Sequence, residues 1–328
     1  MPTLLLTRTD VAELLPMPDC IAAVAEAFRA HAEGKTPAPP GILGAHLEGG
    51  GFHIKTAAMA GTPGYFVAKI NANFPANPAR FGLPTIQGVI ALFETASGRL
   101  LALLDSIEVT VLRTAAASAL AARELALPEA ASVTLLGCGT QARAHLRALA
   151  CVRTLCRVRA LDQDPARARE LVRDLGAELG VEMTAESDLG AAVAASQICV
   201  TCTTSKQPVF TRAFLHPGLF IAAVGADNPE KQEMEPAVMA AARVVVDVPE
   251  QAPTIGDLHH AIAAGAMTPE GIHATLGQVL AGQRPGRRTA EEIFVFDSTG
   301  TALQDVAASV VVYERARQSG RGVEISLA

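Results

Sequence analysis

Hydrophobic and polar positions change their spacing several times along residues 132–162. An apolar run at 133–136 is followed by glycines, by an amphipathic stretch that opens at Thr140, and by a second apolar run that ends at Asp162. Short apolar runs are typical of buried strands, and the amphipathic spacing is typical of a helix. The pattern predicts a strand, a tight turn, a helix and a second strand, which is the layout of a dinucleotide-binding βαβ unit.

The same alternation continues toward the C-terminus. It predicts helices at 140–150 and 165–179, strands near 157–162, 197–203, 219–224 and 242–247, a further strand in EIFVFD, and a last helix from Thr301 to Gln318. Right-handed crossovers would wind these strands into an open, doubly wound parallel sheet of the Rossmann type. The expected fold class of this part is therefore α/β.

The first third of the chain has a different pattern. Helical spacing predicts a helix from Cys20 to Gly34, and short apolar runs broken by Gly, Pro and Asn between Phe52 and Leu104 predict an antiparallel sheet. The Ala-rich stretch from Thr110 to Leu127 predicts a helix that leads into the second domain. We therefore expect an α+β domain beside the Rossmann domain.

Composition excludes several classes of partner. A chain of 328 residues suits two domains, and its net charge of -6 lacks the basic surplus that nucleic-acid binding requires. We see no run of about 18 apolar residues that would predict a membrane helix. Because Asp10 interrupts the apolar N-terminal stretch, a signal peptide is not indicated. We expect a soluble, cytoplasmic protein with no nucleic-acid or membrane partner.

Cysteine and histidine do not indicate a metal site. The six cysteines lie mostly in apolar surroundings, as expected of reduced core thiols. Cys199 and Cys202 have C-x-x-C spacing, but no second Cys or His pair stands near them. The adjacent His259 and His260 would point in different directions, which favours structural or cofactor-edge roles.

The glycine-rich turn carries the chemistry of the βαβ unit. Gly137 permits a sharp turn out of the strand, Gly139 lets the backbone approach a pyrophosphate, and the small Ala142 allows the helix to lie close to the sheet. The helix that opens at Thr140 offers free N–H groups and the positive end of its dipole to phosphates. The turn therefore predicts a nicotinamide-type cofactor.

Asp162 stands where the acid that binds an adenosine ribose is expected, which favours NAD over NADP. Arg157 and Arg159 precede it, and a nearby cation could hold a 2′-phosphate, so both nucleotides stay open. An alternative role for Asp162 is to cap the next helix, although Asp164 before a proline is the better cap candidate.

Three further positions suggest a binding site. Lys69 lies on an apolar predicted strand, where a lysine needs an anionic partner unless it is exposed at a sheet edge. Arg113 has almost only apolar helical neighbours, and a guanidinium is suited to bidentate contact with a carboxylate or phosphate. Asp227 follows a buried-type strand, at a place where a carboxylate could act as acid or base.

These pieces together resemble the ornithine cyclodeaminase/mu-crystallin family. The motifs that carry the resemblance extend over nearly the whole chain and are KINANFPANPARFGLPTIQGVIALFETASGRLLALLDS, RTAAASALAA, GCGTQARAH, VGADNPEKQE and FDSTGTALQD. The resemblance implies a Rossmann NAD(P)-binding domain, residues 123–300, inserted into a substrate-binding and dimerisation domain made of residues 1–122 and 301–328. It also implies a homodimer.

The resemblance assigns roles to the candidate residues. Lys69 and Arg113 would hold a substrate carboxylate, and Asp227 would donate or accept a proton. The cofactor would be bound by Thr85, Arg113, Gly137, Gly139, Thr140, Gln141, Ala142 and Asp162, with Thr203, Val224, Gly225, Ser298 and Thr299 nearby.

The strand before the lysine motif indicates which of the family's reactions to expect. Ornithine cyclodeaminases carry a glutamate there that engages the distal amine, whereas this chain reads GFHIKT with His53 and Lys55. It is more similar to the ketimine reductases of the family, which reduce cyclic imino acids such as Δ1-pyrroline-2-carboxylate or Δ1-piperideine-2-carboxylate with NAD(P)H. Lys55, with His53 nearby, would add to a positive pocket for a small carboxylate. Ornithine cyclodeaminase, an alanine-dehydrogenase-like enzyme and a mu-crystallin-like binding protein are the alternatives.

Overall fold

The computed structural model describes residues 2–37 and 40–327. They form two compact units, one made of residues 1–113 and 301–328 and the other of residues 114–300. The division falls within helix α4 (Ser106–Leu125), whereas the sequence predicted a boundary later in the same helix, after residue 122.

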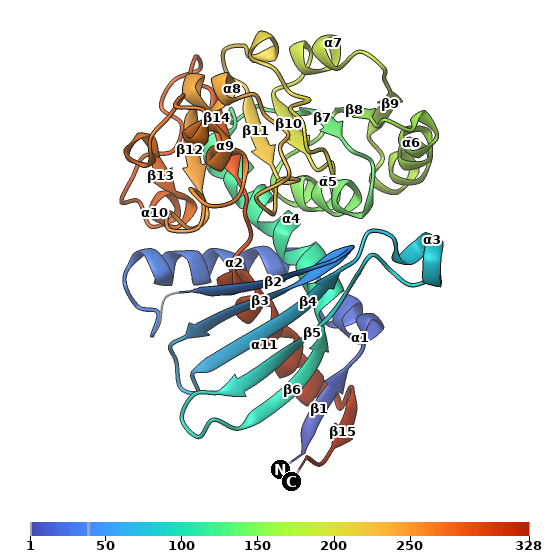
Figure 1. The fold of residues 1–328 in the computed structure, drawn as a ribbon, viewed down its shortest axis with the longest axis vertical. Helices are drawn as coiled ribbons and strands as arrows, with labels where there is room; N and C mark the ends of the chain where they lie inside the picture. Colours follow the sequence, from blue (N-terminus) through green and yellow to red (C-terminus); the bar gives the residue numbers. More distant parts are fainter. Residues whose placement is uncertain (1, 38–39, 328) are drawn as a thin grey trace. The chain divides into compact units, whose positions relative to one another are not determined.

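The first unit is built on a seven-stranded sheet. Its order is β15-β1-β6-β5-β4-β3-β2, and the neighbours from β2 to β6 pair antiparallel (Figure 1). The strands are β1 (Thr3–Leu6), β2 (Gly41–Leu47), β3 (Gly50–Met59), β4 (Tyr65–Asn73), β5 (Ile86–Glu94), β6 (Leu100–Asp105) and β15 (Val323–Ile325). The antiparallel sheet expected from the short apolar runs is therefore present.

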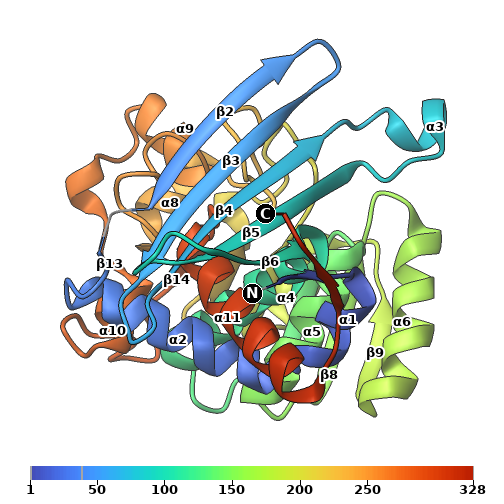
Figure 2. The ribbon, with the colours of Figure 1, turned by 90° about the horizontal axis from the view of Figure 1, so that it is seen from below.

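Helices cover one face of this sheet. Helix α11 (Ala302–Ser319) packs against β3, β4 and β5, and α2 (Met17–Ala32) packs beside it (Figure 2). The apolar side of α2, with Cys20, Val24 and Phe28 at helical spacing, is buried. The short helices α1 (Arg8–Leu14) and α3 (Asn77–Phe81) complete the unit.

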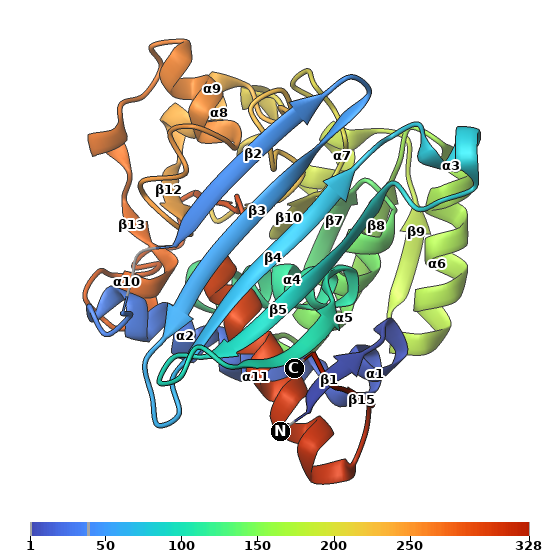
Figure 3. The ribbon, with the colours of Figure 1, turned by 60° about the horizontal axis from the view of Figure 1, so that its bottom comes forward.

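The other face of the sheet carries an exposed row of apolar side chains. Leu43, Ile54, Ile70 and Val89 stand directly opposite one another across β2, β3, β4 and β5. Leu43 is 66%, Ile70 42% and Val89 37% exposed. Because neighbouring residues of a strand point to opposite faces, Lys55 and Lys69 lie on the helix-covered side. Figure 3 looks onto the face with this apolar row.

The second unit is an α/β fold with an eight-stranded parallel sheet in the order β13-β12-β14-β11-β10-β7-β8-β9. The strands are β7 (Ser132–Leu136), β8 (Arg157–Leu161), β9 (Glu182–Ala185), β10 (Ile198–Thr201), β11 (Phe220–Ala223), β12 (Arg243–Val246), β13 (Ala274–Thr275) and β14 (Phe294–Asp297). The chain runs outward from β7 through β8 to β9 and returns to β10 beside β7. The carboxyl ends of β7 and β10 are therefore the switch point at which open α/β sheets bind ligands.

Helices connect and flank the parallel strands (Figure 1). They are α5 (Thr140–Val152), α6 (Pro165–Leu179), α7 (Leu189–Ala194), α8 (Pro236–Ala241), α9 (Asp257–Ala263) and α10 (Leu276–Leu280), with 3-10 turns at Arg212–Phe214 and Pro269–Gly271. The predicted strands of this unit agree closely with these bounds, and so do the predicted helices that correspond to α5, α6 and α11. The short β1, β9, β13, β15, α1, α3 and α7–α10 were not predicted, because so few residues show no clear period. Strand β2 was also missed, because the glycines and prolines around it indicated a connection.

Candidate functional site

Two lysines face each other in the sheet of the first unit. Lys55 on β3 and Lys69 on β4 are paired in register, and both are buried. Like charges directly opposite one another destabilise a sheet, and a buried charge without a counter-ion costs still more. This pair therefore requires an anion close by.

Asp305, in the first turn of α11, is that anion. Its carboxylate lies 2.6 Å from Lys69 Nζ through Oδ2 and accepts a 3.1 Å hydrogen bond from Arg113 Nε through Oδ1. The side chains of all three residues are almost completely buried. We call Lys55, Lys69, Arg113 and Asp305 the cation cluster. It contains the three basic residues that the family resemblance assigned to a positive pocket.

Helix α4 presents one side to the cluster. Ser106, Thr110 and Arg113 are spaced by four and three residues, so they lie on one face of the helix. Ser106 Oγ donates to Asn71 Oδ1 at 2.6 Å, and Lys69 Nζ donates to Thr110 Oγ1 at 3.4 Å. These contacts fix the helix against β4 and thereby place the Arg113 guanidinium over the lysine.

Gln304 extends the cluster with an unused donor. Its Oε1 accepts a 2.6 Å hydrogen bond from Arg113 Nη1. Its Nε2 is buried and has no hydrogen-bond partner among the described residues. Because burying a polar group without a partner costs free energy, this N–H group is suited to meet an acceptor that a ligand brings.

Burial and charge set the protonation of the cluster. Burial lowers the pKa of Lys69 to about 7; the Asp305 carboxylate opposes this effect, and the charges of Arg113 and Lys55 add to it. Burial alone would raise the pKa of Asp305, but Lys69 and Arg113 hold it below its ordinary value. Three basic side chains thus surround one ionised carboxylate. The excess of positive charge suits an anionic ligand.

Two other predicted residues of this unit lie on or beside the strands of the sheet. His53 is half-buried on β3 and shares a sheet face with Lys55, two residues away. Thr85 lies just before β5, where its carbonyl accepts a 2.8 Å hydrogen bond from Phe74 N.

The second unit has the geometry of a dinucleotide turn. Gly137 follows β7 with φ +92°, and a Cβ there would lie 2.9 Å from the carbonyl oxygen of Cys202 beyond β10. Gly139 faces open space at its α carbon, and α5 begins at Thr140 immediately after it. Buried Ala142 lets this helix lie against the sheet. The turn therefore stands at the switch point and leaves its helix N-terminus accessible to a phosphate.

A buried histidine fixes the start of α5. His145 Nδ1 donates to the carbonyl oxygen of Gln141 at 2.7 Å, and its Nε2 accepts from Ser118 Oγ at 2.9 Å. Burial lowers the pKa of His145 to about 4, so the neutral ring that this arrangement needs is present at neutral pH. The sequence analysis did not single out His145.

Asp162 binds the backbone of the glycine turn directly. Its Oδ2 accepts from Cys138 N at 2.7 Å and its Oδ1 from Asp164 N at 2.9 Å. Asp164 is the N-cap of α6, as expected. Arg157 pairs with Glu182, and Arg159 donates to the carbonyl oxygen of Ala195. Both arginines thus have partners other than the loop that carries Asp162.

The other predicted cofactor residues lie at the carboxyl ends of neighbouring strands. Thr203 follows β10, Val224 and Gly225 follow β11, and Ser298 and Thr299 follow β14. The hydroxyl of Ser298 is buried and has no hydrogen-bond partner among the described residues. Cofactor atoms would supply such a partner.

Asp227 also follows β11, but on the surface of this unit. Its side chain is 49% exposed, and Oδ1 lies 2.8 Å from Lys231 Nζ. His260 Nε2 donates to the carbonyl oxygen of Lys231 at 2.9 Å and so steadies this loop. His259 contacts the carbonyl oxygen of Pro253, so both histidines contact the backbone of neighbouring loops.

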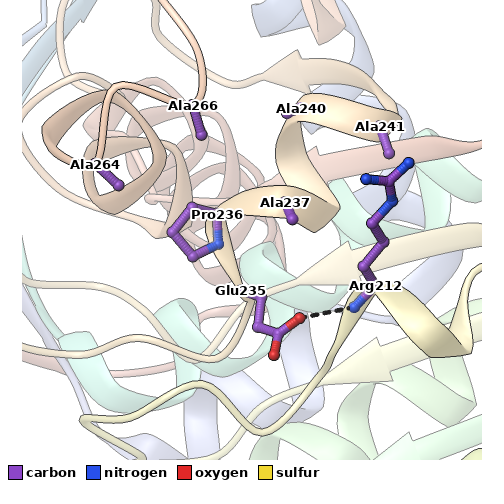
Figure 4. Close-up of a pocket in the computed structure, with 8 residues that line it drawn as sticks. All are labelled: Arg212, Glu235, Pro236, Ala237, Ala240, Ala241, Ala264 and Ala266. Carbon is purple, nitrogen blue, oxygen red and sulfur yellow. Dashed lines mark hydrogen bonds between the residues drawn. The ribbon is translucent and has the colours of Figure 1, made fainter.

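A shallow pocket elsewhere in this unit has no comparable chemistry. It lies beside α8 and is lined mostly by alanines, and its ion-forming side chains are Arg212 and Glu235 (Figure 4). The hydrogen bond drawn there joins Arg212 N to the Glu235 carboxylate at 2.9 Å. Among the described residues, no group of His, Cys, Asp and Glu could hold a metal ion, and no helix is long and apolar enough to cross a membrane.

Comparison with known proteins extends these observations. The family model for the ornithine cyclodeaminase/mu-crystallin family matches residues 1–320. The chain belongs to this family. The resemblance inferred from the separated motifs is thereby confirmed, and so is the Rossmann-type α/β fold.

Members of this family are similar to the chain over its whole length. Alanine dehydrogenase of Archaeoglobus fulgidus is 37% identical over 99% of this chain and 98% of that protein. The solved structure of an archaeal alanine dehydrogenase dimer with bound NAD has a TM-score of 0.95 at 36% identity, with 100% of both chains covered. Thermococcus litoralis Δ1-pyrroline-2-carboxylate reductase, solved with NADH and L-proline, has a TM-score of 0.93 at 28% identity and covers 98% of this chain and 100% of its own.

Sequence reasoning missed the anion that organises the cation cluster. Asp305 stands in the quoted motif FDSTGTALQD, but an acid in a first helical turn is ordinarily explained by the helix dipole. The signal that could have identified Gln304 and Asp305 is their position in a stretch of otherwise small and apolar residues. The sequence analysis assigned no role to Lys231 or His145, although Asp227 and Gln141, their partners, each lie only four residues away.

Replacing Asp305 should destabilise this family member strongly. Asp305→Asn removes the counter-charge of Lys69 and Arg113, and breaking a buried ion pair in this way costs about 3 to 5 kcal/mol. Urea denaturation measures the change in the free energy of unfolding. The matched control is Asp19→Asn, because Asp19 also pairs with a residue of α11, Arg315, but its side chain is exposed. Loss of this exposed ion pair should cost at most about 1 kcal/mol. Equal costs for the two variants would contradict the role of Asp305.

Proposed function

We propose that the protein is an NAD(P)H-dependent reductase of small 2-imino carboxylates, with Δ1-pyrroline-2-carboxylate or Δ1-piperideine-2-carboxylate as the first candidates. The observation that carries the proposal is the buried cation cluster, in which three basic side chains share one carboxylate. A substrate carboxylate would supply the second anion and would accept from the free N–H of Gln304. A diamine substrate fits less well, because a further cation beside Lys55 would be repelled.

The residues of each unit have separate tasks in this proposal. The cation cluster would bind and orient the carboxylate of the imine, while the turn from Gly137 to Ala142 would hold the pyrophosphate of the cofactor. The nicotinamide supplies a hydride to the carbon of the C=N bond. The imine nitrogen must carry a proton for that carbon to be electrophilic, and the salt-bridged Asp227 would accept a hydrogen bond from that N–H group.

The surroundings of Asp162 favour NADH over NADPH. A 2′-phosphate would meet the carboxylate of Asp162, and Arg157 and Arg159 are engaged by other partners. The relatives solved with NAD and NADH are consistent with this preference.

Alanine dehydrogenase activity is the second candidate. The match to the archaeal alanine dehydrogenase extends over nearly all of both chains, and that activity passes through the imine that pyruvate forms with ammonia. This imine is also a small 2-imino carboxylate, so the same cluster would bind it. The two candidates differ in whether the imine is cyclic.

We expect the purified protein to oxidise NADH when Δ1-pyrroline-2-carboxylate is added, measured by the fall in absorbance at the nicotinamide band. Parallel assays with Δ1-piperideine-2-carboxylate, with pyruvate plus ammonia and with NADPH rank the substrates and nucleotides. Asp227→Ala should lose turnover and keep NADH binding, since Asp227 acts on the imine nitrogen. Binding of NADH without turnover on any imine would contradict the enzyme proposal and favour a binding protein.

The affinity for a carboxylate should depend on pH through Lys69. Because the pKa of Lys69 is about 7, its charged form predominates below that pH and is lost above it. The inhibition constant of pyrrole-2-carboxylate, whose ring does not titrate here, should therefore be flat at low pH and rise above about pH 7, by up to about tenfold per unit. Lys69→Met should remove this dependence, whereas the exposed Lys206→Met should retain it. A rise that persists in Lys69→Met would contradict the assignment.

We further propose that two copies pair through the sheet face that carries Leu43, Ile54, Ile70 and Val89. This row is apolar and continuous across four strands, with Leu43, Ile70 and Val89 exposed, and such a surface is typical of an interface. The archaeal alanine dehydrogenase with the same fold is a dimer.

A charge in this row should separate the copies. Ile70→Glu places a carboxylate at its centre, and light scattering coupled to size exclusion should then report a monomer instead of a dimer. The control is Val323→Glu, at an exposed apolar position on β15 in the same unit. A dimer that survives Ile70→Glu at micromolar concentration would exclude this face.

A further inference from the structure

The carboxylate of Glu233 lies completely buried where two parallel strands end. Its Oε1 accepts from Thr203 N at 2.6 Å, and its Oε2 accepts from Thr201 Oγ1 at 2.7 Å and from Gly225 N at 2.8 Å. Thr201 ends β10, and Gly225 follows β11 by two residues. One side chain thus binds the backbone just beyond both strands, where their own ladder of hydrogen bonds has stopped.

The fit around this carboxylate is close. A Cβ on Gly225 would lie 2.5 Å from Cδ of Glu233 and 2.4 Å from the carbonyl oxygen of Thr203. Burial raises the pKa of Glu233 above its ordinary value, although the hydrogen bonds from Thr203, Thr201 and Gly225 oppose that rise. Because two backbone N–H groups each take a different oxygen, the ionised form satisfies both of them.

Two further buried carboxylates hold Glu233 in place. Asp257 Oδ1 accepts from the backbone N–H groups of Glu233 and Met234, each at 2.8 Å. Asp297, the last residue of β14, accepts in turn from Asp257 N at 3.2 Å and Leu258 N at 2.9 Å. Since β14, β11 and β10 are neighbours in the sheet (Figure 1), this chain of carboxylates crosses their carboxyl ends.

We propose that Glu233 is a positioning residue for the nicotinamide end of the cofactor and for Asp227. The segments that it binds carry Thr203, Val224 and Gly225, and Asp227 follows two residues later. The inference rests on the proposed function, because it assigns to that reaction a residue that contacts neither substrate nor cofactor. Sites of this kind need their backbone held to within about 0.5 Å, which hydrogen bonds from rigid neighbours provide.

The isosteric variant Glu233→Gln tests the inference. Whichever way the amide is turned, its NH2 group faces a backbone N–H, so either Thr203 or Gly225 loses its acceptor. We expect the dissociation constant of NADH, measured by isothermal titration calorimetry, to rise and kcat/KM for NADH to fall about tenfold or more. KM for the imine should stay unchanged, because its carboxylate is bound by residues of the other unit.

Gln197→Ala is the matched control at the opposite end of the same strands. Gln197 Oε1 accepts from Ala131 N, Ser132 N and Ser132 Oγ, so it joins the amino ends of β7 and β10 with the same number of hydrogen bonds. This variant should lower the melting temperature and leave the affinity for NADH as in the unaltered protein. Thr201→Val removes one hydroxyl donor to Glu233 and should give a smaller rise in the NADH dissociation constant.

The outcomes separate the two proposals. Failure of the unaltered protein to bind NADH or NADPH would overturn the proposed function, and with it the inference. Normal binding and turnover by Glu233→Gln, with only a lower melting temperature, would overturn the inference alone. An equal loss of NADH affinity in Gln197→Ala would do the same. If Glu233→Gln does not fold, Thr201→Val decides in its place, and unaltered NADH affinity in that variant overturns the inference.

Discussion

The first unit depends on one buried carboxylate that forms two ion pairs. Lys55 and Lys69 face each other across two strands, and Arg113 shares Asp305 with Lys69, so the sheet could not hold these charges without Asp305. Helix α11 carries that carboxylate from the far end of the chain. The same carboxylate is too little to neutralise three basic side chains. The interaction that makes the fold possible therefore also leaves a positive site for an anion.

In the second unit, carboxylates bind backbone N–H groups, whereas in the first unit a carboxylate binds basic side chains. Its parallel strands end in backbone N–H groups that have no ladder partner, and carboxylates accept hydrogen bonds from them. Asp162 binds the glycine turn, Glu233 binds the ends of β10 and β11, and Asp297 binds the start of α9. A buried carboxyl group costs free energy unless hydrogen bonds satisfy it. The presence of several at this edge indicates that a fixed backbone there is worth that cost.

Family membership and local geometry contribute different things to the functional argument. The family relates the chain to an alanine dehydrogenase and to a Δ1-pyrroline-2-carboxylate reductase. The cation cluster adds a buried positive site, which under the proposed function would bind the carboxylate of a small imine. Which substrate is preferred, by size and by whether its imine is cyclic or open, depends on contacts around the carboxylate. The proposed assays compare these substrates directly.

The sequence by itself determined the long periodic elements, the glycine turn and the family. Those signals are local: an alternation of apolar residues, a helix stop, and a motif such as GCGTQARAH lie within one stretch of chain. It also singled out Lys69 and Arg113, because charged residues stand out in apolar runs. Only the tertiary structure decided their partner, since Asp305 is separated from Arg113 by 192 positions. Glu233 was hidden for the same reason: its role depends on which strand ends become neighbours, and strand order is a property of the folded sheet.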